Sequence, residues 1–80
     1  MNVRFKLHGT LRKFLPAGAS DNTVAVELHD GATVADAIAR LAIPAGYAKM
    51  IVCGVDYLEP TSVLQDGQEV NLFPPLAGGA

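Results

Sequence analysis

The chain has 80 residues, of which half are hydrophobic and 18% are charged, and its formal net charge is −2 at pH 7. This length makes one domain, too small to enclose a large active site, and the composition is that of a compact folded chain rather than a disordered one. No basic stripe marks a nucleic-acid surface, and the longest apolar stretches are far shorter than the roughly 20 residues that span a membrane. We therefore expect neither a nucleic-acid partner nor a membrane partner.

A single cysteine, Cys53, excludes an intramolecular disulfide, which is consistent with a reducing cytoplasm. Met1 leads directly into a strand-like segment rather than a signal peptide, so we expect a cytoplasmic location. Cys53 ends an apolar run that begins at Met50. A thiol in such a run is typical of a small buried side chain, although a nucleophile is the alternative.

The first part of the chain predicts two strands joined by a short helical turn. Hydrophobic residues alternate with polar ones at 2–8 and again at 23–29, which predicts half-buried strands that pair antiparallel. Residues 11–15 have helical spacing and are followed by Pro16, so a single turn or short helix is expected there. The composition of residues 17–22 is that of a loop.

The middle of the chain predicts one helix. The turn Asp30-Gly31 precedes Thr33, a plausible N-cap, and Asp36 lies three residues on, as in a capping box with a shorter acidic side chain. Hydrophobic residues then recur at i, i+3, i+4 and i+7, so about ten residues share one apolar face: Val34, Ala37, Ile38 and Leu41. Pro44 ends the helix.

The last part of the chain predicts a short buried strand at 50–53, a brief edge strand at 55–58 and a final strand at 69–73. Val63 and Leu64 are expected to be buried before the turn at Asp66-Gly67. In the final strand Val70 and Leu72 are expected to point inward, which leaves Phe73 on the opposite face or at the edge. Phe73 then either folds back on a neighbouring strand or belongs to an exposed apolar patch for a partner.

The segment after the final strand has an unusual composition. Pro74 and Pro75 fix φ and remove two backbone donors, so the strand must stop pairing and the chain continues extended. Gly78 and Gly79 have no Cβ, so they can thread a narrow channel and leave their carbonyl carbons open to approach. Residues 74–79 could reach about 20 Å beyond the fold. Such a tail suits chemistry at a main-chain carboxylate inside a partner's active site, and the alternative is a merely disordered terminus.

These elements predict an α+β fold with one main helix on one face of a mixed sheet of four to five strands. The first and last strands are expected at the centre, which is the β-grasp (ubiquitin-like) arrangement. We expect a β-grasp domain over residues 1–73 and an extended C-terminal tail over residues 74–80.

With this order of elements, the chain resembles the MoaD/ThiS family of ubiquitin-like sulfur carriers, and most of all the molybdopterin synthase small subunits. The resemblance covers nearly the whole chain, and the proline-proline-x-x-glycine-glycine end is its most specific part. The matching residues are Val3-Arg4-Phe5, Leu11-Arg12, Asp30-Gly31-Ala32-Thr33-Val34, Asp66-Gly67-Gln68-Glu69-Val70 and Phe73-Pro74-Pro75-Leu76-Ala77-Gly78-Gly79.

The resemblance implies that other enzymes act on the tail. An adenylyltransferase of the ubiquitin-activating type, similar to MoeB and ThiF, uses ATP and Mg²⁺ to adenylate the terminal glycine, and sulfur transfer gives a thiocarboxylate. A MoaE-like molybdopterin synthase large subunit then holds the sulfur acceptor. The chain itself shows no Walker-type loop, so we expect it to bind no cofactor. The resemblance implies Gly79 as the reactive residue, Gly78 as the residue that gives it clearance, and a partner-binding segment of Phe73, Pro74, Pro75, Leu76 and Ala77.

Ala80 departs from this pattern, because it holds the carbonyl of Gly79 in a peptide bond. Removal of Ala80 by a peptidase is the favoured explanation; an atypical terminus and loss of the carrier role are the alternatives. Two other function classes stay open: a ubiquitin-like modifier conjugated to lysine, and a non-catalytic β-grasp binding module. A carrier for thiazole or amino-acid biosynthesis is a variant of the first class.

The side chains themselves predict no active site. His8 and His29 fall on the polar side of predicted strands and are expected to be solvated, and a metal site would need further ligands near them. The acidic residues suit turns, caps and surfaces rather than a catalytic pair or triad: Asp21, Glu27, Asp30, Asp36, Asp56, Glu59, Asp66 and Glu69. Whether the protein counts as an enzyme therefore depends on the complex in which it acts.

Overall fold

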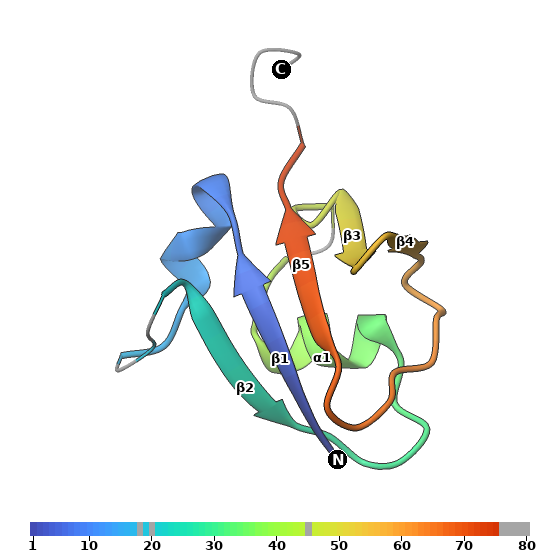
Figure 1. Ribbon diagram of the computed structural model, residues 1–80. Helices are drawn as coiled ribbons and strands as arrows, with labels where there is room; N and C mark the ends of the chain where they lie inside the picture. Colours follow the sequence, from blue (N-terminus) through green and yellow to red (C-terminus); the bar gives the residue numbers. More distant parts are fainter. Residues whose placement is uncertain (18, 20, 45, 76–80) are drawn as a thin grey trace.

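Five strands form a single sheet with the order β2-β1-β5-β3-β4, as Figure 1 shows. The computed structural model describes residues 1–17, 19, 21–44 and 46–75. In chain order the elements are β1 (Asn2–Leu7), the 3-10 helix η1 (Gly9–Phe14), β2 (Thr23–Glu27), α1 (Val34–Arg40), β3 (Met50–Cys53), β4 (Asp56–Leu58) and β5 (Glu69–Phe73).

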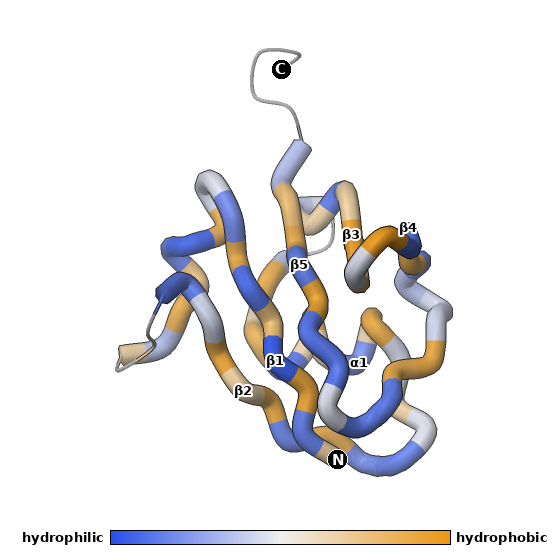
Figure 2. The backbone as a smooth tube through the Cα atoms, in the orientation of Figure 1, coloured by the Kyte–Doolittle hydropathy of each residue, from blue (hydrophilic) through white to orange (hydrophobic). Residues whose placement is uncertain are grey.

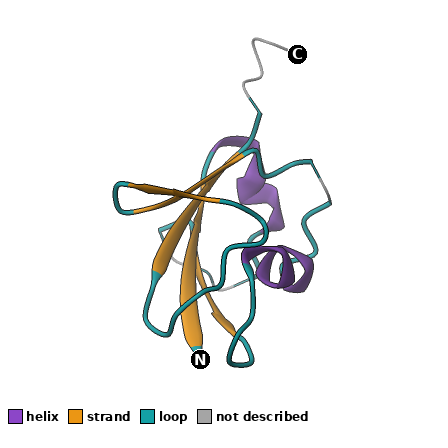
Figure 3. Cartoon of the chain, turned by 90° about the vertical axis from the view of Figure 1, so that its right-hand side faces the viewer, coloured by secondary structure: helices purple, strands orange, loops and turns teal. Residues whose placement is uncertain are grey.

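The first and last strands lie side by side at the centre of the sheet and run parallel, with Phe5 opposite Val70 and Leu7 opposite Leu72. Their outer neighbours β2 and β3 pair with them antiparallel, and β4 pairs antiparallel with β3. The sheet is therefore mixed, with α1 on one side of it (Figure 3). This is the predicted β-grasp fold.

The core lies between the sheet and the helical elements. Figure 2 shows hydrophobic and hydrophilic residues alternating along β1 and β5. Because successive side chains of a strand point to opposite faces, every second residue of these strands is buried against α1 and η1. The fully buried large side chains are Phe5, Leu7, Leu11, Leu72, Val3, Val34 and Val70.

The start of α1 is the predicted capping box. The backbone N–H of Asp36 donates to Thr33 Oγ1 at 3.3 Å, and the N–H of Thr33 donates to Asp36 Oδ2 at 2.9 Å. The hydrogen bond from the Thr33 N–H favours the carboxylate, so it lowers the pKa of Asp36 below its ordinary value of 3.8.

The helix is shorter than the ten residues that the sequence predicts. It has seven residues, Leu41 is its C-cap and Ala42 adopts a left-handed φ of 59°. The N–H of Ile43 donates to the carbonyl of Ile38 at 3.2 Å, which closes the end of the helix. The residue before a proline is disfavoured in helical conformation, so the chain turns out of the helix before Pro44.

Two predictions of burial are wrong. In β3 only Ile51 is buried, whereas Met50 is 42% exposed, because one face of an antiparallel sheet is covered and the other is open. Val63 forms an isolated bridge with Thr33 and is exposed, whereas Leu64 is buried. In each case extended backbone sends adjacent side chains to opposite sides.

The turn before β5 fixes the direction of the tail. Asp66 Oδ1 accepts from the N–H of Asn2 at 2.7 Å, and the N–H of Gly67 donates to the carbonyl of Asn2 at 2.8 Å. Strands β1 and β5 therefore begin together and end together, at the end of the sheet opposite the N-terminus (Figure 1). No helix in the described ranges has the length and apolarity to span a membrane.

Candidate functional site

The end of β5 is held by a backbone hydrogen bond on each side. The N–H of His8 donates to the carbonyl of Leu72 at 3.1 Å, and the N–H of Lys49 donates to the carbonyl of Phe73 at 2.8 Å. Pro74 and Pro75 follow and have no N–H to continue the ladder. The point at which the chain leaves the sheet is therefore fixed by the sequence.

The rings of His8 and Phe73 lie against one another at this point. Their centroids are 4.3 Å apart and their planes differ by 7°. Nε2 of His8 lies 2.8 Å from Oδ1 of Asn71. A carbonyl oxygen only accepts hydrogen bonds, so this contact places the proton of a neutral His8 on Nε2. The stack and the hydrogen bond together orient Phe73 on the outer face of the sheet.

Gly9 lets the helix η1 approach the tail closely. Its φ is +58°, a conformation that other residues adopt at a cost, and a Cβ there would lie 3.0 Å from Cγ of Pro74. Backbone therefore packs directly against the first proline. Gly9 thus lies against the first residue after β5, while hydrogen bonds from His8 and Lys49 hold the last two residues of β5 from both sides.

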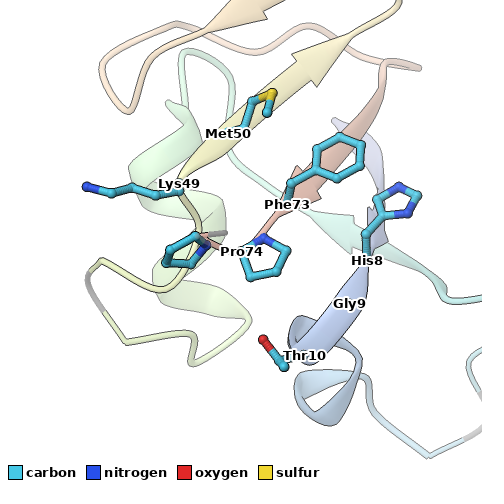
Figure 4. A pocket seen from close by; sticks show the side chains of 8 residues that line it. His8, Gly9, Thr10, Lys49, Met50, Phe73 and Pro74 are labelled. Carbon is cyan, nitrogen blue, oxygen red and sulfur yellow. The ribbon is translucent and has the colours of Figure 1, made fainter. Parts of the chain in front are cut away.

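An open groove of about 720 Å³ surrounds this point, and we call it the tail-root groove. Its lining is mainly apolar and comes from the end of β1, from η1, from β3 and from the end of β5 (Figure 4). Figure 4 shows the side chain of Lys49 extending outward on the side away from His8. The lining residues are His8, Gly9, Thr10, Lys49, Met50, Phe73, Pro74 and Pro75.

A shallower, more polar depression adjoins the groove. It shares Gly9 and Thr10 with the groove and is also lined by Arg12 and Lys13 of η1. The ammonium of Lys13 lies 5.3 Å from the ring centroid of Tyr47 and 5.4 Å from that of Phe14, so two aromatic rings hold this cation in place. Cationic side chains thus lie beside the tail-root groove.

The predicted site residues fall into two groups. Phe73, Pro74 and Pro75 line the tail-root groove. Leu76, Ala77, Gly78 and Gly79 lie outside the described residues, and their roles remain predictions. The sequence did not indicate the groove residues that other elements supply: His8, Gly9, Thr10, Lys49 and Met50. Their proximity depends on strand pairing, for which a single sequence gives no direct signal.

The remaining candidate residues do not gather into a site. His29 is exposed as predicted, whereas the prediction of a solvated His8 is wrong, because its ring is half-buried against Phe73. Cys53 is half-buried rather than buried, and Nε2 of Gln68 donates to its sulfur at 3.7 Å. Within the described part of the chain, no three His, Cys, Asp or Glu side chains converge as metal ligands.

A β-grasp sheet that delivers a proline-led tail from its central strand defines a ubiquitin-like protein of the MoaD/ThiS type. The chain belongs to the Mut7-C ubiquitin family, whose model matches residues 1–78. Comparison with curated proteins gave no match.

Solved structures agree with this assignment. The crystal structure of SAMP1 from Haloferax volcanii is 25% identical, with a TM-score of 0.75 over 99% of this chain and 100% of that chain. A putative molybdopterin converting factor, subunit 1, from Pyrococcus furiosus is 27% identical, with a TM-score of 0.69 over 94% of this chain and 98% of that one. The MoaD/SAMP-type fold therefore supports a sulfur carrier or a ubiquitin-like modifier.

Proposed function

We propose that this chain is a sulfur carrier that accepts sulfur as a thiocarboxylate on Gly79 and donates it in molybdopterin synthesis. The observation that carries the proposal is the fixed exit of the tail: β5 is held on both sides up to Phe73, and two prolines then end the pairing. The similarity to the molybdopterin converting factor subunit supports the pterin pathway. Carriers for thiazole or amino-acid biosynthesis share the same chemistry.

The proposed chemistry has two displacement steps. An oxygen of the Gly79 carboxylate attacks the α-phosphorus of ATP, pyrophosphate leaves, and an acyl-adenylate forms. Hydrosulfide then attacks the carbonyl carbon, the bond to AMP breaks, and the thiocarboxylate remains. The first step is needed because a carboxylate resists nucleophiles until it carries a good leaving group. Glycines at 78 and 79 leave that carbon open to attack.

In this scheme the side chains of this protein bind and position its partners, and only the main-chain carboxylate of Gly79 takes part in covalent chemistry. ATP and Mg²⁺ are bound by an activating partner of the MoeB/ThiF type, and the sulfur acceptor is held by a MoaE-like large subunit. The tail-root groove gives these partners a surface beside the point at which the tail enters them. Fixing the point at which the chain leaves β5 lowers the entropic cost of bringing the reactive group to a partner's active site. The proposed site of action is the cytoplasm.

Free Gly79 is required for this chemistry, so whatever follows it must be removed. Ala80 follows it in the sequence. We propose that a peptidase cleaves the bond between Gly79 and Ala80 before activation. The same glycine-rich backbone that admits the activating enzyme would admit the protease.

A ubiquitin-like modifier is the second candidate, and one comparison favours it. A structure described as H. volcanii small archaeal modifier protein 1 shares the fold at 22% identity and a TM-score of 0.71. A modifier would use the same adenylate, but the amine of a target lysine would displace AMP and form an isopeptide bond. A binding module with an inert tail is the third possibility.

Intact mass spectrometry distinguishes these three. The chain ending at Gly79 is incubated with activating enzyme, ATP, Mg²⁺ and sulfide, beside a control chain that retains Ala80. We expect the first chain to gain the mass difference between sulfur and oxygen and the control to stay unchanged. Lysine-linked conjugates without a sulfur adduct would instead support the modifier. An unchanged mass in both chains would contradict the carrier role.

A further inference from the structure

The strand β2 forms an open edge of the sheet (Figure 1). It pairs with β1, and in the described part of the chain no strand lies on its other side. The N–H groups of Met1 and Leu28 each donate to the other residue's carbonyl, at 2.7 and 2.8 Å. Hydrogen-bonded and non-hydrogen-bonded pairs alternate along an antiparallel ladder. The backbone N–H and C=O groups of Thr23, Ala25 and Glu27 therefore point away from β1.

The sequence of β2 does not protect this edge. Proteins usually blunt an open edge with lysine, proline, a bulge or a very short strand. β2 reads Thr-Val-Ala-Val-Glu, and its register with β1 is unbroken over all five residues. The strand at the opposite edge of the sheet, β4, has only three residues. The β2 edge can therefore pair with a further strand along its whole length.

A groove of about 230 Å³ lies beside this edge, on the side of the sheet that α1 covers. Val24 is half-buried there, whereas Val26 is buried. A strand added at the edge would cover Val24 and extend the core beyond β2. The lining residues are Phe14, Pro16, Val24, Ala25, Val26, Arg40 and Leu41.

The charges beside the β2 edge differ between its two ends. Lys6 is the partner of the first residue of β2, and Arg12 and Lys13 line a depression that reaches the residue before it. At the other end Glu27 is the last residue of β2, and both it and Asp30 are exposed. The start of the edge is therefore mainly cationic and its end mainly acidic.

From this edge we propose that the chain forms a dimer in which β2 pairs antiparallel with β2 of a second copy, about a two-fold axis at Ala25. The two five-stranded sheets would join into one. Thr23 of each copy would lie opposite Glu27 of the other, and their outward backbone groups would complete the ladder. On the core side, Val24 of each copy would lie beside Val26 of the other, so the two cores would meet.

Charge complementarity favours a second copy as the occupant of this edge. Antiparallel pairing brings the cationic end of one copy to the acidic end of the other. Glu27 of one copy would lie two strand spacings, about 10 Å, from Lys6 of the other, across the short side chain of Thr23, and both charged side chains are long enough to meet. Two groups run against the general trend, and they would also face one another. Asp21 precedes β2, whereas Arg40 lines depressions beside the end of β2.

The proposed dimer leaves the tail-root groove open, because β2 contributes no residue to it. The two copies of β5 would run in opposite directions, since β5 is parallel to β1 and β1 is antiparallel to β2. The two tail-root grooves would therefore lie at opposite ends of the joined sheet. This dimer goes beyond the proposed function and does not depend on it.

The dimer is expected to be weak. Specific interfaces generally bury at least about 1,000 Å² in total, and pairing of five residues from each copy makes a small interface. We therefore expect monomers at about 1 µM and mainly dimers at about 1 mM.

Sedimentation equilibrium of the full chain tests the proposal. The apparent mass is expected to rise with concentration from 8.4 kDa toward twice that value. Glu27→Lys is expected to weaken association roughly tenfold, because it places a lysine beside Lys6 of the other copy at both symmetry-related contacts. Glu59→Lys changes the net charge equally but lies in the loop after β4, so it is expected to change association less than about twofold.

A mixture of two variants tests the antiparallel register. Lys6→Glu alone should also weaken association, because it places two carboxylates together. In a heterodimer of Lys6→Glu with Glu27→Lys, both contacts again join opposite charges, so the equimolar mixture should associate about as strongly as the unaltered chain. Ala25→Pro removes an N–H that points away from β1 and is expected to abolish association while the sheet still forms. Circular dichroism checks that each variant is folded, and the charge variants decide if Ala25→Pro does not fold.

Four results would overturn the proposal. The first is a chain that stays monomeric at about 1 mM. The second is equal association of Glu27→Lys and Glu59→Lys. The third is a mixture of Lys6→Glu and Glu27→Lys that associates no better than either variant alone. The fourth is a dimer that persists in a folded Ala25→Pro variant, because that dimer would use another surface.

ATP–pyrophosphate exchange with the activating enzyme separates this proposal from the proposed function. Glu27→Lys in the chain ending at Gly79 is expected to leave the KM for activation unchanged, because Glu27 is outside the tail-root groove. A raised KM would contradict the separation of the dimer edge from that groove. Absence of exchange with the unaltered sequence ending at Gly79 would contradict the proposed function and leave the dimer intact.

Discussion

The inner face of the sheet and the tail-root groove are built from the same strands but are covered differently. On β5, Leu72 points inward and is fully buried, whereas the adjacent Phe73 points outward and is half-buried in an open groove. Burial inside the domain stabilises the fold of the free chain, whereas apolar surface left in the groove stabilises only a complex that covers it. One strand therefore buries one set of side chains in the core and presents the other set at the open groove.

The contrast is sharpest when adjacent residues are changed. Leu72→Ala removes a fully buried side chain from the centre of the core and is expected to destabilise the fold by about 3 kcal/mol. Phe73→Ala loses mainly its stack with His8, about 1 kcal/mol, but is expected to raise the KM for activation. Urea unfolding and pyrophosphate exchange measure the two effects. An equal loss of stability in both variants would show that the two faces are not separable.

Two glycines with nearly the same backbone conformation refine the comparison. Gly9 has φ +58° and packs against Pro74, whereas Gly54 has φ +63° and nothing within 4 Å of an added Cβ. Alanine at either position is expected to cost about 1 to 2 kcal/mol through left-handed strain alone. Only Gly9→Ala should also displace Pro74 and thereby raise the KM for activation.

The Gly54→Ala variant serves as the control for backbone strain. If both variants raise KM equally, loss of stability rather than displacement of the tail is the cause. If neither does, the close contact between Gly9 and Pro74 has no part in presenting the tail. Thermal unfolding gives the stability of each variant, and the exchange assay gives KM.

The sequence predicted those parts of the fold that depend on local patterns. The alternation of hydrophobic and polar residues predicted β1, β2 and β5. The spacing of Thr33 and Asp36 predicted the capping box at the start of α1. The central pairing of the first and last strands was also predicted, because a sheet with one covering helix leaves few arrangements. Helix length was overestimated, since no local pattern indicates that Ala42 adopts a left-handed conformation.

Of the candidate site, the sequence indicated the two prolines that end β5 but not the surface around them. The prolines are recognisable wherever they occur, because their effect on the backbone is local. The contact of His8 with Asn71 joins residues 63 positions apart and follows from strand register. Lys49 and Met50 likewise reach the groove through the pairing of β3 with β5. Long-range register therefore brings the lining of the tail-root groove together, and a single sequence does not reveal it.

The smallest expected effect concerns the end of the molecule opposite the tail. Asp36 accepts from the backbone N–H of Thr33, and this hydrogen bond lowers the pKa of Asp36 in the folded state. A depressed carboxylate pKa contributes stability above the pKa of the unfolded state, and that contribution is lost as the pH falls through the folded value. Asp36→Asn is therefore expected to lower stability at neutral pH and to reduce the loss of stability on acidification.

Unfolding midpoints from about pH 6 to about pH 2 measure this effect, because that range spans the titration of carboxyl groups. Asp56→Asn, in β4, is the control, since it removes one carboxylate without touching the capping box. If Asp36→Asn and the unaltered chain lose the same amount of stability as the pH falls, the capping box does not cause that loss. The KM for activation is expected to stay unchanged in Asp36→Asn, because α1 contributes no residue to the tail-root groove. A raised KM would show that the capping box influences the tail-root groove from a distance.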